Sequence, residues 1–224
     1  MTEASHCPYR QSTLLQQVLT PDKMRIAFLL GAGCPVSIQV PKGEGSGPLI
    51  PDIAGLTKQV SEAMAANADF STHYGSLLGR FGDGKATMED ILSEIRLLQG
   101  VVRSGTINGL DANTLAALDA EICRITTGVV RVPLPETTTP YHQLAMWTGG
   151  IRRTHAVEIF TPNYDTLIEQ ALESHQIPYF DGFVGSSQAF FDLTSMENGS
   201  LPPRWSRLWK VHGSINWWRT DVTP

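Results

Sequence analysis

Residues 156–168 read Ala-Val-Glu-Ile-Phe-Thr-Pro-Asn-Tyr-Asp-Thr-Leu-Ile. The first five form a largely apolar, strand-like run, and the segment from Thr161 to Asp165 is typical of a turn. From Leu167 onward, apolar residues recur at helical spacing. A strand, a polar turn and a helix in this order are the unit from which doubly wound parallel sheets are built.

Two distant segments also end an apolar run in small or polar residues. Residues 26–30 read Ile-Ala-Phe-Leu-Leu and precede Gly31, whereas residues 208–211 read Leu-Trp-Lys-Val and precede His212. The continuous run 26–30 is typical of a parallel strand covered on both faces. Because the carboxyl ends of parallel strands meet at one edge of a sheet, we expect the residues after all three strands to form one site.

The region between the first strand and residue 156 is expected to be largely helical. Residues 35–51 are rich in glycine and proline, which predicts a loop and a candidate mobile lid. Thr87 and Asp90 are a capping pair for one of the helices that follow. The predicted helices carry three apolar faces: Leu56, Val60 and Met64; Met88, Ile91, Leu92, Ile95 and Val102; and Leu115, Leu118, Ile122 and Ile125.

These patterns together predict an α/β fold. We expect a Rossmann-like parallel sheet with helices on both faces and a helical insertion at 56–150. Within that insertion the main helices lie between about 56 and 130, and a shorter one covers 141–147. Since the sequence has no Cys-x-x-Cys pair, a zinc module is not expected.

Composition limits the class of protein. The chain has 224 residues, 42% of them apolar, which is enough for a substantial core. A net charge of -5 disfavours nonspecific nucleic-acid binding by this chain alone, although a local basic patch or a basic partner would still supply it. Three cysteines, Cys7, Cys34 and Cys123, suit a reducing compartment, so we expect a cytoplasmic protein. Neither an export signal nor a membrane span is expected.

Each segment of the expected site also has a purely structural explanation. Gly31-Ala32-Gly33 lets backbone N–H groups approach a diphosphate, but the same residues suit a plain tight turn. Asn163 and Asp165 are placed to contact a ribose or a carboxamide, yet both residue types are favoured at the start of a helix. His212 suits proton transfer near neutral pH, while a lone histidine is more often packed or exposed.

In this order, the three segments resemble the sirtuin-like family, whose signature is a Gly-Ala-Gly loop, a later Thr-x-Asn-x-Asp and a His-Gly at a strand end. The resemblance spans residues 26–216, and Leu49-Ile50-Pro51-Asp52 is similar to the family's Gly-Ile-Pro-Asp segment. Within the family, the chain is most similar to the sirtuin-like NAD-hydrolase domains of bacterial anti-phage defence systems.

The resemblance implies a role for particular residues. Asn163 would orient the nicotinamide ribose or a water, Asp165 would hold the carboxamide, and His212 would act as the base. Residues 31–33 would cradle the diphosphate, with Cys34 beside the ribose. The implied NAD-contacting residues are Gly31, Ala32, Gly33, Cys34, Pro51, Asp52, Thr161, Gly213 and Ser214. NAD is the expected substrate, and no metal is expected.

Several departures from the family pattern disfavour protein deacylase activity. Pro162 stands where deacylases have glutamine, and residues 53–55 lack the arginine that follows Pro-Asp in deacylases. The zinc cysteines of deacylases are missing as well. Because the family's sheet continues beyond Pro224, we expect 1–224 to be the N-terminal part of a larger sirtuin-like NAD-binding chain, or to be completed by a partner.

The expected activity is hydrolysis of the nicotinamide glycosidic bond of NAD, which would deplete NAD during anti-phage defence. Since a constantly active enzyme of this kind would poison its host, we expect control by homo-oligomerisation or by a partner such as a helicase-like ATPase or an Argonaute-like protein. Two alternatives stay open: a non-catalytic sensor or scaffold that binds NAD or ADP-ribose and, less favoured, an NAD-dependent deacylase. Direct contact with nucleic acid or membrane is not expected.

Overall fold

A computed structural model describes residues 7–20, 24–82, 84–102, 105–150, 152–198 and 201–218. The chain divides into two compact units, each with its own core. The first combines residues 1–31 with 133–224 and is called the sheet unit, and the second comprises residues 32–132 and is called the helical unit.

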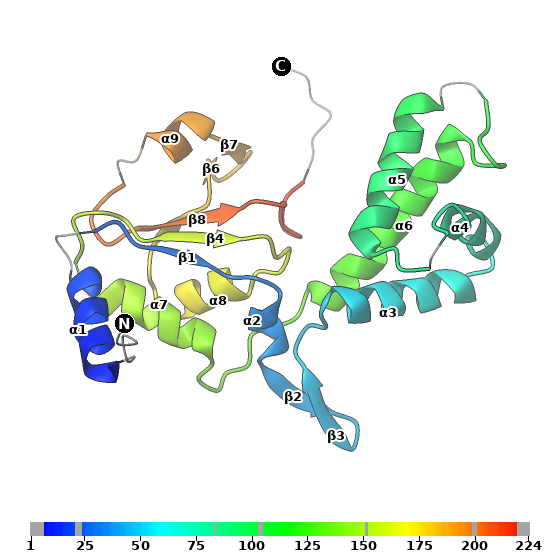
Figure 1. The fold of residues 1–224 in the computed structure, drawn as a ribbon. Helices are drawn as coiled ribbons and strands as arrows, with labels where there is room; N and C mark the ends of the chain where they lie inside the picture. Colours follow the sequence, from blue (N-terminus) through cyan, green and yellow to red (C-terminus); the bar gives the residue numbers. More distant parts are fainter. Residues whose placement is uncertain are drawn as a thin grey trace, which may run out of the picture. The chain divides into compact units, whose positions relative to one another are not determined.

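The sheet unit is built on parallel strands that come from distant parts of the chain (Figure 1). Its strand order is β1-β4-β8-β5, and all three pairings are parallel. A small antiparallel pair, β6 and β7, lies outside this sheet. The elements are α1 (Pro8–Leu19), β1 (Ala27–Leu29), α7 (Pro140–Gly150), β4 (Glu158–Thr161), α8 (Leu167–Ser174), β5 (Tyr179–Phe180), β6 (Phe183–Val184), β7 (Phe190–Phe191), α9 (Leu193–Glu197) and β8 (Ser206–Lys210). The predicted α/β, Rossmann-like fold is confirmed.

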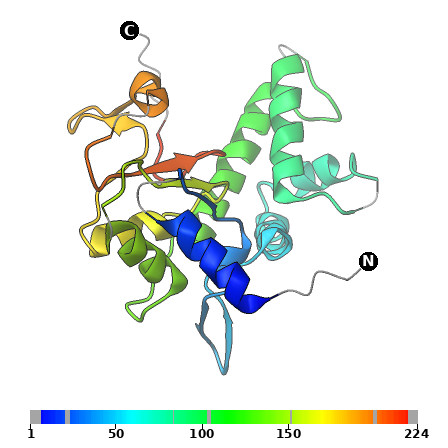
Figure 2. The same cartoon turned by 60° about the vertical axis from the view of Figure 1, so that its left-hand side comes forward.

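One face of the sheet is covered by helices α7 and α8, which lie on the same side in both views (Figures 1 and 2). Phe28, Ile159 and Leu208 are in register across the three longer strands, and the last two are fully buried. The ring of Phe28 meets Trp147 of α7 edge to face, with centroids 5.4 Å apart. This face is therefore the apolar core of the sheet unit.

The opposite face of the sheet is more open. Leu29 is 75% exposed, and its register partners Phe160 and Trp209 are half-buried, with stacked rings whose centroids are 5.6 Å apart. The expectation that residues 26–30 are covered on both faces is thus wrong, because Ala27 and Leu29 are exposed. A continuous apolar run identifies a strand, but it does not reveal whether another layer covers that strand.

The helical unit holds the helices expected between about 56 and 130. Thr87 and Asp90 form the predicted capping box at the start of α5, in which each side chain bonds the other residue's backbone N–H. The shorter helix α7, which lies within 56–150, belongs to the sheet unit. The elements of the helical unit are α2 (Gly33–Val36), β2 (Gln39–Lys42), β3 (Gly45–Pro48), α3 (Ile53–Ala66), α4 (Ser71–Leu78), α5 (Met88–Val101) and α6 (Ala112–Val130).

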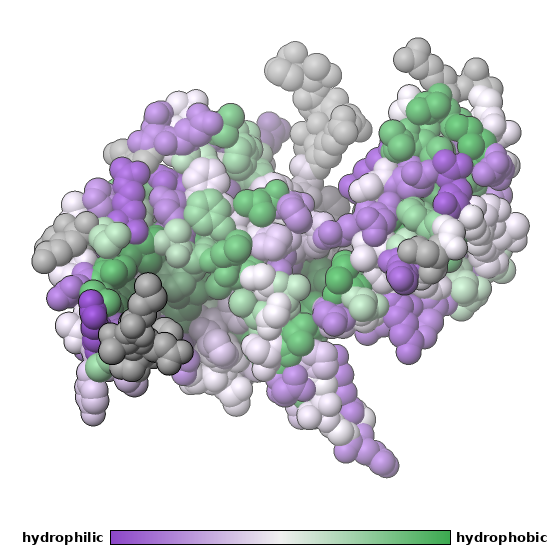
Figure 3. Space-filling model, viewed as in Figure 1, coloured by the Kyte–Doolittle hydropathy of each residue, from purple (hydrophilic) through white to green (hydrophobic). Residues whose placement is uncertain are grey.

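Residues 35–51 were predicted to be a loop, and this prediction is wrong. A short helix, α2, begins at Gly33, and β2 and β3 then form an antiparallel hairpin whose turn contains Gly43 at φ +58°. Figure 3 shows that the surface toward the tip of this hairpin is hydrophilic. Backbone pairing across a tight turn needs no apolar side chains, so a shortage of apolar residues did not exclude strands here.

No helix in the described part of the chain is both long and apolar enough to cross a bilayer. Within the described residues, Cys7, Cys34 and Cys123 form no disulfide bond.

Candidate functional site

The loops that follow β1, β4 and β8 are joined by hydrogen bonds at the carboxyl edge of the sheet. The Leu30 N–H donates to the Phe160 carbonyl at 2.8 Å, and the Val211 N–H donates to the Thr161 carbonyl at 3.0 Å. The ladder thus extends one residue past β1 and β8, and their loops begin side by side. The sheet brings Gly31 together with the Asn163 and His212 segments, as the sequence predicted for these three loops.

Thr161 fixes the point where the chain leaves β4. Its side chain is buried, and its Oγ1 donates to the Leu30 carbonyl at 2.8 Å while accepting from the Asn163 N–H at 3.1 Å. Pro162 cannot continue the ladder because it has no N–H. The Thr161 hydroxyl therefore ties two loops together.

Asn163 is half-buried and faces the first loop. Its Nδ2 donates to the Gly31 carbonyl at 3.1 Å. Since a carbonyl can only accept, the amide must present its nitrogen to Gly31, and its Oδ1 remains as the acceptor. Of the three proposed catalytic residues, Asn163 is the one that directly contacts the Gly31 loop in the described residues.

Asp165 turns into the protein. It is 5% exposed, and its Oδ1 accepts from the Leu167 N–H at 3.0 Å, at the start of α8. Burial raises the pKa of this carboxyl, while the hydrogen bond from Leu167 and the nearby Lys210 ammonium oppose the shift. This geometry matches the helix-start alternative that the sequence left open for Asp165.

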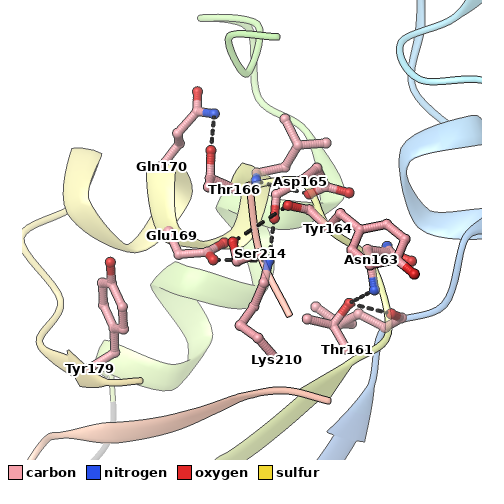
Figure 4. A network of polar contacts seen from close by, with 12 residues as sticks. Thr161, Asn163, Tyr164, Asp165, Thr166, Glu169, Gln170, Tyr179, Lys210 and Ser214 are labelled. Carbon is pink, nitrogen blue, oxygen red and sulfur yellow. Dashed lines mark hydrogen bonds and ion pairs between the residues drawn. The ribbon is translucent and has the colours of Figure 1, made fainter. Parts of the chain in front are cut away.

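Lys210 is a buried cation that points toward Glu169 and the Asp165 turn (Figure 4). The side chain of Lys210 is 1% exposed, and its Nζ lies 3.0 Å from Glu169 Oε1 and also donates to the Asp165 backbone carbonyl. Burial raises the pKa of Glu169, and the facing ammonium opposes the rise. Lys210 thereby links β8 to the turn between β4 and α8.

Lys210 and Glu169 were not among the site residues predicted from the sequence. The signal was present, because Lys210 interrupts the apolar run of β8 and Glu169 interrupts the apolar stripe of α8. A charged residue on a buried face requires a partner, and these two are of opposite sign. Periodicity alone could not pair them, because they belong to different elements.

His212 is exposed and follows β8 directly. Its ring lies beside that of Tyr164, with centroids 6.4 Å apart. Gly213 closes the turn at φ +94°, a conformation that favours glycine, and its N–H donates to the Lys210 carbonyl at 3.1 Å. The Ser214 Oγ donates to the Tyr164 carbonyl at 3.4 Å. The accessible imidazole of His212 therefore lies next to the Asn163–Asp165 segment.

The remaining predicted residues are Gly31 and five residues of the helical unit. Gly31 has no positive φ, and a Cβ added there would meet nothing within 4 Å, so no packing contact in the described residues explains this glycine. Asp52 caps α3, accepting from the Gly55 N–H at 2.8 Å. Five predicted residues belong to the helical unit and are not part of the sheet-edge site described above: Ala32, Gly33, Cys34, Pro51 and Asp52.

This edge offers an amide oxygen, an accessible imidazole and, at Gly31, backbone without a Cβ atom. Those groups suit a ligand with a ribose and a reaction that needs a base. Within the described residues, no group of three or more His, Cys, Asp and Glu side chains is placed to hold a metal ion.

A family model described as SIR2-like domain matches residues 157–223. The matched segment includes β4, α8, β8 and the loops that carry Asn163 and His212. The sirtuin-like resemblance is confirmed over this part of the chain. The SIR2-like family uses NAD, so the match is consistent with an NAD-utilising enzyme. None of the curated proteins matches the sequence.

The hydrogen bond at the start of α8 predicts different outcomes for two substitutions of Asp165. Asp165→Asn keeps an oxygen that accepts from the Leu167 N–H, whereas Asp165→Ala removes it and should cost about 1–2 kcal/mol of unfolding free energy. Urea unfolding of both variants at neutral pH measures the difference. An equal loss in both would contradict the assigned hydrogen bond.

The raised pKa of Asp165 also predicts a pH dependence. Because the folded protein holds this proton more tightly than the unfolded chain, the group's contribution to stability falls as pH rises from its ordinary value of 3.8 through the raised pKa. Asp165→Asn should lack this fall, which a series of unfolding curves over that pH range would detect. Parallel pH profiles of wild type and variant would refute the assignment.

The buried pair predicts non-additive effects at Lys210 and Glu169. Lys210→Met leaves a buried carboxylate without its cation and should cost about 3–5 kcal/mol, while adding Glu169→Leu should recover part of that loss. The exposed pair of Lys58 and Glu62 is a matched control, since Lys58→Met should change stability by less than about 0.5 kcal/mol. A double variant no more stable than Lys210→Met would rule out the pair as the cause.

Proposed function

We propose that the chain cleaves the nicotinamide glycosidic bond of NAD. The observation that carries the proposal is the hydrogen-bonded junction of the Gly31, Asn163 and His212 loops at the carboxyl edge of the parallel sheet. Ligands of open α/β sheets bind at this edge, where loops from different strands converge. The SIR2-like match over residues 157–223 supports NAD as the ligand.

In the proposed reaction, water adds to the ribose carbon as nicotinamide leaves, and the products are ADP-ribose, nicotinamide and a proton. The transition state gathers positive charge on the ribose, which the oxygen dipole of Asn163 would stabilise. The exposed His212 would take the proton from water or from a ribose hydroxyl. Asp165 would hold the turn that carries Asn163, since its carboxylate is buried and already bonded.

The biological setting that we propose is NAD depletion during anti-phage defence. An enzyme that destroys a central metabolite must be restrained until it is needed. We therefore propose that homo-oligomerisation or a partner, such as a helicase-like ATPase or an Argonaute-like protein, controls this chain. The resemblance stated from the sequence supports this setting.

A second candidate function is binding of NAD or ADP-ribose without turnover. The observation that favours it is the buried position of Asp165, which removes one carboxylate from direct contact with a ligand. The same loops would then serve a sensor or scaffold. A deacylase is less favoured, because Pro162 and residues 53–55 depart from the deacylase pattern.

Release of nicotinamide from NAD tests the proposal. The protein is incubated with NAD, with and without the product of the neighbouring gene, and free nicotinamide is measured. His212→Ala should lower the rate by roughly 10²–10⁴, the usual range for loss of a general base. Asn163→Ala should lower it by about 10²–10³, as for loss of one electrostatic contact.

His175→Ala is the matched control, because His175 is an exposed histidine at the end of α8, away from the three loops. It should release nicotinamide at the wild-type rate. Full activity in His212→Ala would reject the proposed base. NAD binding by calorimetry without any nicotinamide release, with or without the neighbouring gene product, would favour the binding function.

A further inference from the structure

The amino-terminal ends of the same strands border a separate cavity. It has a volume of about 280 Å³ and is lined by Arg25, by residues of 148–158 and by residues 201–207. Arg25 precedes β1, Glu158 begins β4, and Ser206 begins β8, so the cavity lies at the edge opposite the loops of Asn163 and His212. The proposed NAD chemistry does not use this cavity.

Arg207 lines this cavity and has unused hydrogen-bond donors that are buried beside it. The residue is only 4% exposed, and its Nη1 bonds Glu158 Oε1 at 2.6 Å. Its Nε and Nη2 are buried and have no hydrogen-bond partner in the described residues. These two atoms form one edge of the guanidinium, which is the edge that grips two oxygens of a phosphate or carboxylate side by side.

Arg153 also lines the cavity and has two unused donors, although its Nε and Nη1 do not form one edge of the guanidinium. Its Nη2 donates to the Leu19 carbonyl at 2.9 Å, and its guanidinium lies over the Trp147 ring, 4.5 Å from the centroid. Both contacts hold the group in place without using its Nε and Nη1, which are likewise buried and without a hydrogen-bond partner in the described residues. Leaving donors of a charged group unpaired is costly, so two such groups at one cavity indicate an absent acceptor.

The charge of the lining indicates what that acceptor is. Arg25 and Arg204 also line the cavity, together with Arg153 and Arg207, and Glu158 is the one carboxylate of the lining. A single carboxylate ligand would leave most of this positive charge uncompensated. A phosphate monoester carries about -1.5 to -2 charges near neutral pH and has three acceptor oxygens, so it fits better.

We propose that this cavity binds a phosphate-bearing small molecule, gripped by the Nε–Nη2 edge of Arg207 and by Arg153. The volume is near the lower end for small-molecule sites, which suits a phosphorylated metabolite and excludes a whole dinucleotide. Because the bound phosphate would connect the starts of β4 and β8 with the end of α1, its binding stabilises the sheet unit.

Inorganic phosphate is the probe for the test. Thermal unfolding of the full chain is followed as phosphate increases, with sodium chloride at matched ionic strength as the reference. The midpoint should rise with phosphate and not with chloride. In the wild type, the Nε–H signals of Arg153 and Arg207 in ¹H–¹⁵N spectra should shift during the same titration, which requires no variant to fold.

Two substitutions separate recognition from general charge. Arg207→Lys keeps a cation opposite Glu158 but removes the two-donor edge, and Arg153→Gln removes the second group. Each should weaken phosphate binding by roughly 10-fold to 100-fold. Arg152→Gln changes the net charge equally at an exposed residue that does not line the cavity, so it should bind phosphate as the wild type does.

Three results would overturn the proposal. The first is a wild type whose midpoint responds to phosphate no more than to chloride. The second is a phosphate response that survives in both Arg207→Lys and Arg153→Gln. The third is a titration in which the Nε–H signals of both arginines stay in place.

Discussion

The ammonium of Lys210 is the constraint on which the carboxyl edge of the sheet depends. It lies in the strand between β4 and β5, almost fully buried, with the Glu169 carboxylate and the Asp165 carbonyl as its partners. A charge removed from water must be paired and hydrogen-bonded, so β8, the β4–α8 turn and α8 can adopt few other arrangements. The Lys210–Glu169 pair fixes the positions of these elements more than it stabilises the fold. The free-energy cost of removing both charges from water offsets much of their electrostatic attraction.

As a result, the polar residues at this edge fall into two groups, one that holds the backbone and one that can contact a ligand. The buried members, Thr161, Asp165 and Lys210, hold backbone in place. The half-buried Asn163 and the exposed His212 remain available to a ligand. Hydrogen bonds join the loops that carry them. Preorganisation of this kind is what a site needs when charge develops only in the transition state. The opposite edge differs in character, since its free arginine donors suit recognition of a fixed negative charge.

The sequence was sufficient for the longer strands of the sheet and for most of the long helices. Apolar spacing located α3, α5, α6 and α8, and Thr87 with Asp90 marked the start of α5, because these signals are local. Prediction from the sequence failed where the local pattern of apolar residues was weak or misleading. The hairpin of β2 and β3 has few apolar residues and relies on backbone pairing, and the exposed Leu29 lies in a run that resembles a fully covered strand.

The sequence by itself determined that Gly31, Asn163 and His212 follow parallel strands, and hence that their loops share an edge. Only the tertiary structure decided what each side chain does there. Asp165 is turned inward to the Leu167 N–H, Lys210 is paired with Glu169, and Arg207 keeps one edge of its guanidinium free. The physical reason is that periodicity encodes which face of an element is buried, whereas pairing between elements depends on distances that the order of residues does not contain.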